Sequence, residues 1–320
     1  MHSFKNVLIT GGAGFIGSHI VDHFMADESF ESVTVLDKIT YAADWDHISA
    51  HINNPKFKLV VGDLVDQDSC NRALKGVDLV IHAAAESHVD NSFQSSLIFT
   101  KTNVLGTHTL LQCARESNIL KFIHISTDEV YGETKDGSVK EDDQYNPTNP
   151  YSASKAAAEM IVNGYIRSFD FPASIVRANN MYGIRQFPEK LIPRSILRLL
   201  CGKDIQLHGD GKNYRTYLSV IDFCQALELI SKNETTHEIY NVGSEEEYTN
   251  LQIAEIICEK MNFQGKINFV SDRPFNDCRY SIDYGKIEGL GWHPKASLIS
   301  NLDSLVEYYK KRRSHYESIL

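Results

Sequence analysis

The sequence predicts an α/β protein built on a doubly wound parallel sheet, with a smaller α/β substrate-binding region towards the C-terminus. Two observations predict this fold. A short apolar run at residues 6–10 leads directly into a glycine-rich segment at residues 11–17, and strand-like runs then alternate with helical runs as far as residue 176. In such sheets ligands bind at the carboxyl ends of the strands, so the residues that follow each strand are the first candidates for a binding site.

The first turn has the pattern of a phosphate-binding loop. Residues 11–17 read Gly-Gly-Ala-Gly-Phe-Ile-Gly and run into a helical pattern of apolar residues. Glycines allow a tight turn and a close backbone approach to a pyrophosphate, and a helix N-terminus offers free N–H groups to the anion. Alone, the run is equally compatible with a plain turn. The candidate cofactor contacts here are Gly11, Gly14, Phe15, Ile16 and Gly17.

The second predicted strand, residues 32–36, ends in an acidic residue. Asp37 lies twenty residues beyond Gly17, the spacing of an acid that binds a ribose 2′-hydroxyl. A carboxylate would repel a 2′-phosphate, so NAD is favoured over NADP, although the neighbouring Lys38 offers a cation that a 2′-phosphate could use.

Further elements continue the alternation. Strands are predicted at residues 57–61, 77–83, 122–126 and 173–176, and helices at residues 44–53, 67–74, 93–116 and 151–169. This order is typical of a Rossmann-type fold with helices on both faces, in which polar strand ends meet in one cleft. The further candidate cofactor contacts are Asp63, Leu64, Ala83, Ala84, Ala85, Thr102, Tyr151 and Lys155.

After about residue 180 the pattern becomes less regular. A helix is predicted to end near Leu200, with strand-like runs at residues 214–220 and 238–242 and helices at residues 250–261 and 298–312. We therefore expect a dinucleotide-binding domain at residues 1–179 and a mainly substrate-binding region at residues 180–320, partly interleaved with the first. Loop-adjacent basic residues of this half suit a diphosphate-bearing substrate, although each alone has the pattern of a surface charge. They are Lys190, Arg215, Arg273 and Arg279.

Composition excludes several function classes. The chain has 320 residues, a net charge of −10 and a pI of about 5.7, which gives no electrostatic support for nucleic-acid binding. No apolar run is long enough for a membrane helix and the start lacks a signal-peptide pattern, so we expect a cytoplasmic protein. The six cysteines form no CxxC pair, and the His19/His23 and His47/His51 pairs lack a partnering acid, so no metal is expected.

A tyrosine and a lysine mark the predicted helix at residues 151–169. Tyr151 and Lys155 are four residues apart and share one helix face. A free tyrosine has a pKa of about 10, but a neighbouring ammonium and an oxidised nicotinamide would both favour the phenolate. Tyr151 could then remove the proton of an alcohol that is being oxidised.

Five segments of the chain form a recognisable set: residues 10–17, 84–90, 126–132, 151–155 and 187–193. Together they resemble the extended short-chain dehydrogenase/reductases, specifically the nucleotide-sugar 4,6-dehydratases, over nearly the whole chain. The Asp128-Glu129 pair is the most discriminating feature, because related epimerases and decarboxylases usually lack that aspartate beside the glutamate.

The resemblance implies a reaction in three parts. NAD oxidises the sugar at C4, water is eliminated across C5 and C6, and the hydride returns to C6. Tyr151 is implied as the base at the C4 hydroxyl, Lys155 as the modifier of its pKa and a ribose ligand, and Thr127 as a hydrogen-bonding partner. Glu129 would remove the C5 proton, while a protonated Asp128 would donate to the departing C6 hydroxyl, which requires the two carboxyl groups to have different pKa values.

The resemblance also implies substrate contacts, a substrate and an assembly. dTDP-glucose is the expected substrate, and UDP-linked and amino sugars stay open. Helices 93–116 and 151–169 would pair across a homodimer. An epimerase or decarboxylase of the same fold, and a non-catalytic dinucleotide sensor, are the alternatives. The implied substrate contacts are Ser87, Asn180, Glu189, Lys190, Arg215, Asn241 and Arg273, and the departures from the family pattern are Asn91, Met181, Thr216 and Asn276.

Overall fold

The computed structural model describes residues 4–263 and 265–319, and its centre is a seven-stranded parallel sheet. The strand order is β10-β6-β5-β4-β1-β2-β3, which confirms the predicted doubly wound sheet. The strands are β1 Asn6–Thr10, β2 Ser32–Asp37, β3 Phe57–Val61, β4 Leu79–His82, β5 Lys121–Thr127, β6 Ala173–Ala178 and β10 Ile239–Val242.

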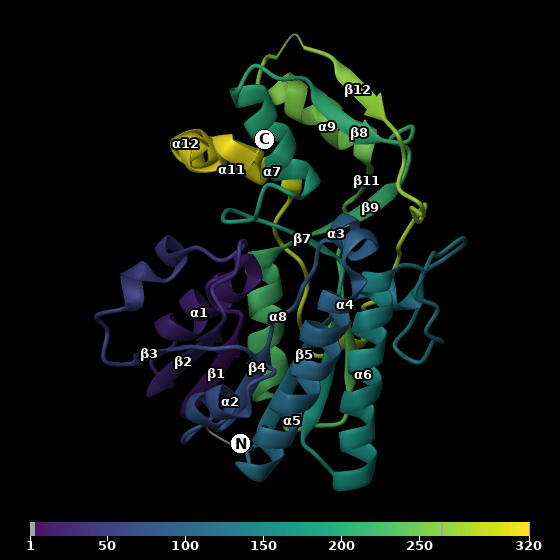
Figure 1. Ribbon diagram of the computed structural model, residues 1–320. Helices are drawn as coiled ribbons and strands as arrows, with labels where there is room; N and C mark the ends of the chain where they lie inside the picture. The colour runs from purple at the N-terminus through teal and green to yellow at the C-terminus, as the bar shows by residue number, and fades with distance from the viewer. Residues whose placement is uncertain (1–3, 264, 320) are drawn as a thin grey trace.

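Helices cover both faces of this sheet (Figure 1). Helices α1 (Phe15–Ala26) and α8 (Val220–Lys232) pack on one face, and α2 (Gln67–Ala73), α5 (Thr107–Glu116) and α6 (Pro150–Phe169) pack on the other. Val7 and Ile9 of β1 point into the first core and Leu8 points into the second. Because both faces are buried, the strands read as continuous apolar runs, which is why the sequence shows them clearly.

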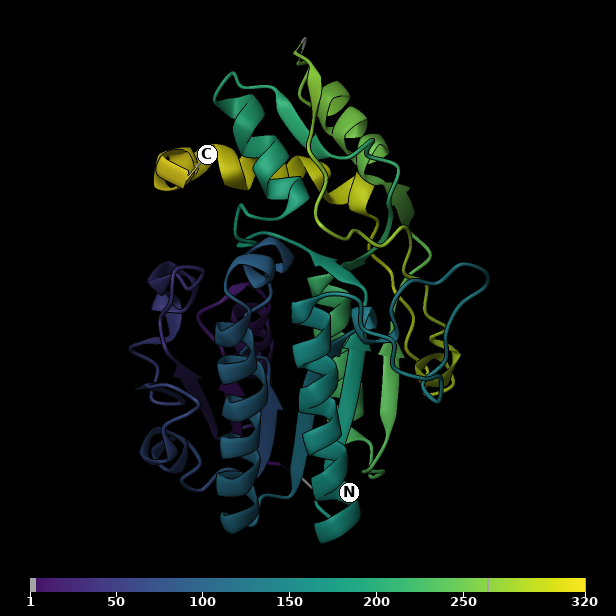
Figure 2. The same cartoon turned by 45° about the vertical axis from the view of Figure 1, so that its right-hand side comes forward.

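The long helices α5 and α6 lie side by side on the outside of the sheet (Figure 2). The predicted helix at residues 93–116 is divided into α3 (Val89–Gln94), α4 (Ser96–Phe99), a π-helical segment at Thr100–Gly106 and α5. Helix α6 begins with a capping box, in which Asn149 and Ser152 each bind the other's backbone N–H, and Pro150 occupies its first turn.

The predicted helix at residues 44–53 is wrong. The structure has two single 3₁₀ turns there, Trp45–His47 and Ser49–His51. The backbone N–H of Asp44 donates to the carbonyl of Ala13 at 3.0 Å, and the His47 ring binds the same oxygen at 3.1 Å. These contacts to the glycine-rich turn hold the segment as a loop in spite of its helical pattern.

The C-terminal region stands above the carboxyl ends of the sheet strands (Figure 1). Its core lies between α7 (Leu191–Leu200), α9 (Asn250–Lys260), α11 (Leu298–Lys311) and the strand pair β8 (Ile205–His208) and β12 (Ile267–Val270). A sheet of β7 (Asn180–Tyr182), β9 (Tyr214–Ser219) and β11 (Glu247–Thr249) lies between this core and the main sheet. The short helices are the 3₁₀ turn η4 (Asp128–Tyr131), α10 (Gly285–Glu288), α12 (Arg313–Tyr316) and the 3₁₀ turn η5 (Glu317–Ile319).

A buried ion pair joins the sheet to α6. Arg177 of β6 and Glu159 of α6 are 1% and 0% exposed, and Arg177 Nη2 lies 2.7 Å from Glu159 Oε2. The same guanidinium donates to the hydroxyl oxygens of Tyr131 and Tyr145, each at 2.6 Å. Because Tyr131 ends the turn η4, this network fixes that turn against the helix that carries Tyr151 and Lys155.

Replacement of Arg177 by methionine is expected to lower the free energy of unfolding by about 3–5 kcal/mol, because it leaves the Glu159 carboxylate buried without its cation. Chemical denaturation measures the change, with Arg167→Met on the exposed part of α6 as the control. A loss below about 1 kcal/mol, the scale of an exposed pair, would contradict the structural role.

Candidate active site

The glycine-rich turn is packed too closely for any side chain at two positions. Gly11 has a φ of +71°, and a Cβ there would lie 2.8 Å from the Cα of Ala84. A Cβ on Gly17 would lie 2.0 Å from the carbonyl oxygen of Gly11. These contacts bring the start of α1 against the end of β1, so that backbone N–H groups face the cleft.

Asp37 ends β2 beside this turn. Its Oδ2 accepts the N–H of Ala13 at 2.9 Å and its Oδ1 accepts the N–H of Ile39 at 2.7 Å. Burial raises the pKa of the Asp37 carboxyl, and these backbone hydrogen bonds oppose the rise. Lys38 is the cation that could have bound the 2′-phosphate of NADP, and its ammonium pairs with Asp63 at 2.7 Å. The Asp37 carboxylate therefore borders the cleft, and the Lys38 ammonium is paired with another carboxylate.

One cleft of about 590 Å³ collects the strand ends and the C-terminal region. Each candidate cofactor residue borders it, from Gly11 through Thr102 to Lys155. The candidate substrate residues that border it are Ser87, Asn180, Glu189, Lys190, Arg215 and Arg273, and the candidate catalytic residues are Thr127, Glu129, Tyr151 and Lys155.

Asp128 lies directly beneath the cleft surface. The residue is 2% exposed; its Oδ1 lies 3.1 Å from the Thr127 hydroxyl, and its Oδ2 accepts the Asn179 amide at 2.7 Å. Burial, and then the charge of Glu129, raise the pKa of the Asp128 carboxyl to about 7. The Asp128 carboxyl is therefore about half protonated at neutral pH. Of its two partners that border the cleft, the Thr127 hydroxyl, unlike the Asn179 amide, can both accept and donate a proton.

Glu129 borders the cleft directly. Burial raises the pKa of its carboxyl, whereas the Asn149 amide and the charges of Arg215 and Lys190 lower it. Asn149 donates to Glu129 Oε2 at 3.2 Å and also caps α6. Burial raises the pKa of both neighbouring carboxyl groups, but the charge of Glu129 raises that of Asp128 further, whereas Arg215 and Lys190 both lower that of Glu129.

Tyr151 and Lys155 of α6 border the same cleft, close to the end of β5. Burial, followed by the charge of Glu129, raises the pKa of Tyr151, and a hydrogen bond with Thr127 lowers it. Burial lowers the pKa of Lys155 to about 8, and its ammonium donates to the carbonyl of Ile125 at 2.7 Å. Without a ligand, Tyr151 therefore keeps its proton. The expected phenolate depends on an oxidised nicotinamide as well as on the Lys155 ammonium.

Cations gather on the substrate side of the cleft. Lys190 donates to the carbonyl of Ser87 at 2.8 Å, Arg215 donates to Asn276 Oδ1 at 3.1 Å, and Arg273 pairs with Asp90 at 2.5 Å. Glu189 accepts the Tyr41 hydroxyl at 3.2 Å. Among the described residues, the buried Asn180 amide nitrogen has no hydrogen-bond partner and is available to a ligand.

The four departures from the family pattern fall on this side or beneath it. Asn276 holds Arg215, as described above, and Met181 borders the cleft with 9% exposure. Asn91 donates to the Tyr41 hydroxyl at 3.5 Å, whereas Thr216 is buried and donates to the carbonyl of Tyr280 at 3.3 Å.

The prediction that Asn241 contacts the substrate is wrong. Asn241 lies in β10 of the main sheet, is 0% exposed and does not border the cleft. Its side chain accepts the Tyr131 hydroxyl at 2.9 Å and donates to the carbonyls of Val139 and Asp283. All of its donors and its acceptor are therefore occupied by the protein itself.

Two asparagines that sequence reasoning missed hold the acidic pair. Asn149 binds Glu129 and Asn179 binds Asp128, and both border the cleft. The Asn-Pro sequence before Tyr151 is a helix-start signal that could have identified Asn149. Asn179 has no local signal, because its partner is 51 residues away in the sequence.

The fold and this cleft define the class of protein: an enzyme of the extended short-chain dehydrogenase/reductase kind. A family model described as GDP-mannose 4,6 dehydratase matches residues 8–304. The chain belongs to this family, the nucleotide-sugar 4,6-dehydratases.

Individual relatives agree with this family. A trifunctional UDP-glucose 4,6-dehydratase/UDP-4-keto-6-deoxy-D-glucose 3,5-epimerase/UDP-4-keto-L-rhamnose-reductase of Arabidopsis thaliana is 43% identical over 95% of this chain, which spans only 47% of the plant protein. A dTDP-glucose 4,6-dehydratase of Actinoplanes sp. is 39% identical over 96% of this chain and 98% of its own length. The structure of a dTDP-glucose 4,6-dehydratase from Streptomyces venezuelae with NAD and TYD bound has a TM-score of 0.96 and 39% identity, covering 99% of this chain and 100% of that one.

Proposed function

We propose that this enzyme converts a nucleotide-diphosphate hexose to its 4-keto-6-deoxy derivative in an NAD-dependent dehydration. One observation carries the proposal: Asp128 and Glu129 follow β5 directly with different neighbouring charges, in the same site as Tyr151 and Lys155. An alcohol oxidation alone needs the tyrosine and the lysine. The additional acid and base fit the removal of water.

The cofactor part of the cleft fits NAD. The Asp37 carboxylate borders the cleft, and each of its oxygens has accepted one backbone N–H and retains a lone pair for a ribose hydroxyl. The packed glycines would leave backbone N–H groups for the pyrophosphate, and Lys155, which borders the cleft, would bind the nicotinamide ribose. NAD, when bound, supplies hydride acceptance from sugar C4, hydride return to C6 and a positive charge that favours the Tyr151 phenolate.

The protein groups have separate tasks in this proposal. Tyr151 takes the proton of the C4 hydroxyl, with Thr127 as a hydrogen-bonding partner. Glu129 takes the C5 proton, which the C4 ketone makes acidic. Asp128 releases its proton towards the departing C6 hydroxyl through Thr127. Lys190, Arg215 and Arg273 bind the diphosphate, and Ser87, Asn180 and Glu189 border the sugar.

Replacement of Glu129 by glutamine is expected to lower product formation by about 100-fold, because the amide cannot take the C5 proton. In deuterated water the wild-type enzyme should introduce deuterium at sugar C5, and Glu129→Gln should not, as mass spectrometry can show. Glu116→Gln, at the exposed end of α5, is the matched control. Undiminished deuterium incorporation in Glu129→Gln would remove Glu129 from the reaction.

The nucleotide and sugar are tested with a panel of dTDP-, UDP-, CDP- and GDP-hexoses. We propose dTDP-glucose as the substrate, supported by the dTDP-glucose dehydratases among the relatives; UDP-glucose is the second candidate, supported by the plant relative. Mass spectrometry should show the loss of one water from the preferred substrate. A product with the mass of its substrate would indicate epimerisation, and no conversion of any member would favour a non-catalytic sensor.

We further propose a homodimer formed through the outer helices. Leu97 and Leu105 beside α6 are 82% and 51% exposed, and Met160 of α6 is 47% exposed, an apolar surface that a second copy would cover. Analytical ultracentrifugation should give twice the mass of the chain.

A cytoplasmic location is supported by six free cysteines. Within the described residues, no helix is long and apolar enough to span a membrane.

A further inference from the structure

The loop between β2 and β3, residues 38–56, forms one wall of the cofactor part of the cleft and is called the cofactor loop below. Lys38, Thr40, Ala42 and Ala43 of this loop border the cleft. The loop is also tied to the glycine-rich turn, through the bonds from Asp44 and His47 to the Ala13 carbonyl described above. A movement of this loop would therefore open the cleft beside the dinucleotide and release the turn that holds its pyrophosphate.

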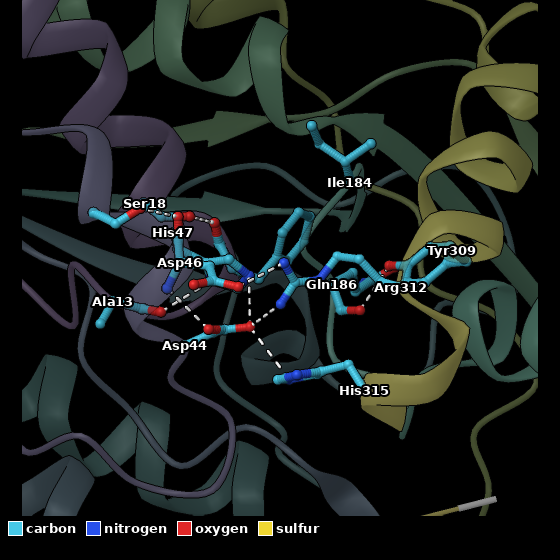
Figure 3. A network of polar contacts seen from close by, with 12 residues as sticks. Ala13, Ser18, Asp44, Asp46, His47, Ile184, Gln186, Tyr309, Arg312 and His315 are labelled. Atoms are coloured by element: carbon cyan, nitrogen blue, oxygen red, sulfur yellow. Dashed lines mark hydrogen bonds and ion pairs between the residues drawn. The ribbon is translucent and has the colours of Figure 1, made fainter. Parts of the chain in front are cut away.

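Residues after α11 contact this loop through ion pairs (Figure 3). Arg312, which follows α11, pairs through Nη2 with Asp44 and through Nη1 with Asp46 at 3.0 Å. His315 Nε2 lies 3.3 Å from the same Asp44 oxygen that Arg312 binds. The Arg312 and Asp44 side chains are only 20% and 13% exposed, so this pair is screened by water far less than an ordinary surface pair.

The same end of the chain contacts the substrate wall. The Tyr309 hydroxyl donates to the carbonyl of Gln186 at 2.6 Å, as Figure 3 shows, and the Gln186 amide donates to the carbonyl of Met181 at 2.8 Å. The Tyr316 ring packs edge-to-face on Phe187 at 6.3 Å. Gln186, Met181 and Phe187 all border the cleft, so one short segment touches both of its walls.

Phe187 completes the connection between the walls. Its ring also packs edge-to-face on Tyr41 of the cofactor loop, at 5.4 Å between ring centroids. The cofactor loop is thus held by an aromatic contact on its cleft side and by the Arg312 ion pairs on its outer side. Both contacts cross from the C-terminal half to the N-terminal domain.

We propose that Tyr309, Arg312, His315 and Tyr316 form a C-terminal latch that keeps the cofactor loop closed, with Arg312 as a positioning residue that slows release of the bound dinucleotide. The inference rests on the proposed NAD site. For the dinucleotide to leave sideways, residues 38–46 must move outward, and this movement breaks both Arg312 ion pairs. Charge-assisted hydrogen bonds of this kind are stronger than neutral ones, and Arg312 makes two of them, one to Asp44 and one to Asp46.

The experiment compares Arg312→Gln with the control Arg313→Gln. The guanidinium of Arg313 pairs with Glu317 at 3.4 Å, outside the latch. Each protein is loaded with NADH, excess NAD is added, and the decay of the fluorescence of bound NADH gives the dissociation rate. Arg312→Gln should release NADH about tenfold faster, the factor that corresponds to 1.4 kcal/mol, and Arg313→Gln at the wild-type rate. At saturating NAD and substrate, Arg312→Gln should keep the wild-type kcat.

A second variant tests the loop side. Asn is as good an N-cap as Asp, so Asp44→Asn keeps the cap to the N–H of Asp46 and removes the charge. It should also accelerate release, and the combined effect in the double variant should be smaller than the sum of the two single effects, because both changes remove the Arg312–Asp44 pair.

The outcomes separate the two proposals. Equal release rates for wild type, Arg312→Gln and Asp44→Asn would overturn the latch alone. A fall in melting temperature of Arg312→Gln without faster release would also overturn it, since the role would then be stability only. If the wild-type protein binds no dinucleotide, the proposed function fails and the latch with it.

Discussion

Replacement of Asp128 by asparagine is expected to lower formation of the 4-keto-6-deoxy product by about 10²–10⁴-fold, the contribution of one positioned acid. The asparagine has nearly the same shape and can still accept the Asn179 amide, so the cleft and its cofactor site should remain intact. What it lacks is the proton that burial keeps on Asp128. Dehydration should stop after the C4 alcohol is oxidised, and absorbance spectra should show reduced nicotinamide.

The pH dependence provides a second test of Asp128. The pKa of this carboxyl is raised to about 7, so the acid is present below that pH and is lost as the pH rises through it. Wild-type kcat should therefore fall above about pH 7. The small residual activity of Asp128→Asn should lack this fall. Asp136→Asn, in an exposed loop, is the control, and near-normal turnover of Asp128→Asn would end the assignment.

Replacement of Tyr151 by phenylalanine is expected to cause a loss of similar size, about 10²–10⁴-fold, but at an earlier point. Tyr151 is almost fully buried, and phenylalanine fills the same space without a group that can take the C4 hydroxyl proton. Stopped-flow absorbance should show no reduced nicotinamide after substrate is added.

The two variants differ in what they retain. Both should still bind NAD, but only Asp128→Asn should oxidise the sugar. Tyr214→Phe, at a largely exposed tyrosine of β9, controls for loss of a hydroxyl. If Tyr151→Phe reduced NAD at the wild-type rate, another group would have to be the base.

The sequence predicted the parallel sheet and most residues of the cleft for a clear reason. A buried parallel strand is a continuous apolar run, and the glycine turn, Asp37, Asp63 and residues 127–129 follow such runs directly. Their position depends on local sequence and on the rule that strand carboxyl ends meet at one edge. The Tyr151/Lys155 pair is local as well, since a single helix places both.

Other features could not be predicted from the local sequence. The family resemblance implies that Asn241 contacts the substrate, yet the structure buries it against Tyr131, 110 residues away. Residues 44–53 have a helical pattern, yet bonds to Ala13 hold them as a loop. In both cases a contact with a distant segment outweighs a local preference.

The local sequence was therefore sufficient to predict the fold class, the cofactor turn and a site with two neighbouring carboxyl groups and a tyrosine. The pKa values of these groups and the position of the loop beside the cleft depend on tertiary contacts. The proton on Asp128 depends on burial and on the facing Glu129, and the position of the cofactor loop depends on Arg312, 268 residues beyond Asp44. Burial and long-range ion pairs exist only after the chain has packed, which is why no local pattern contains them.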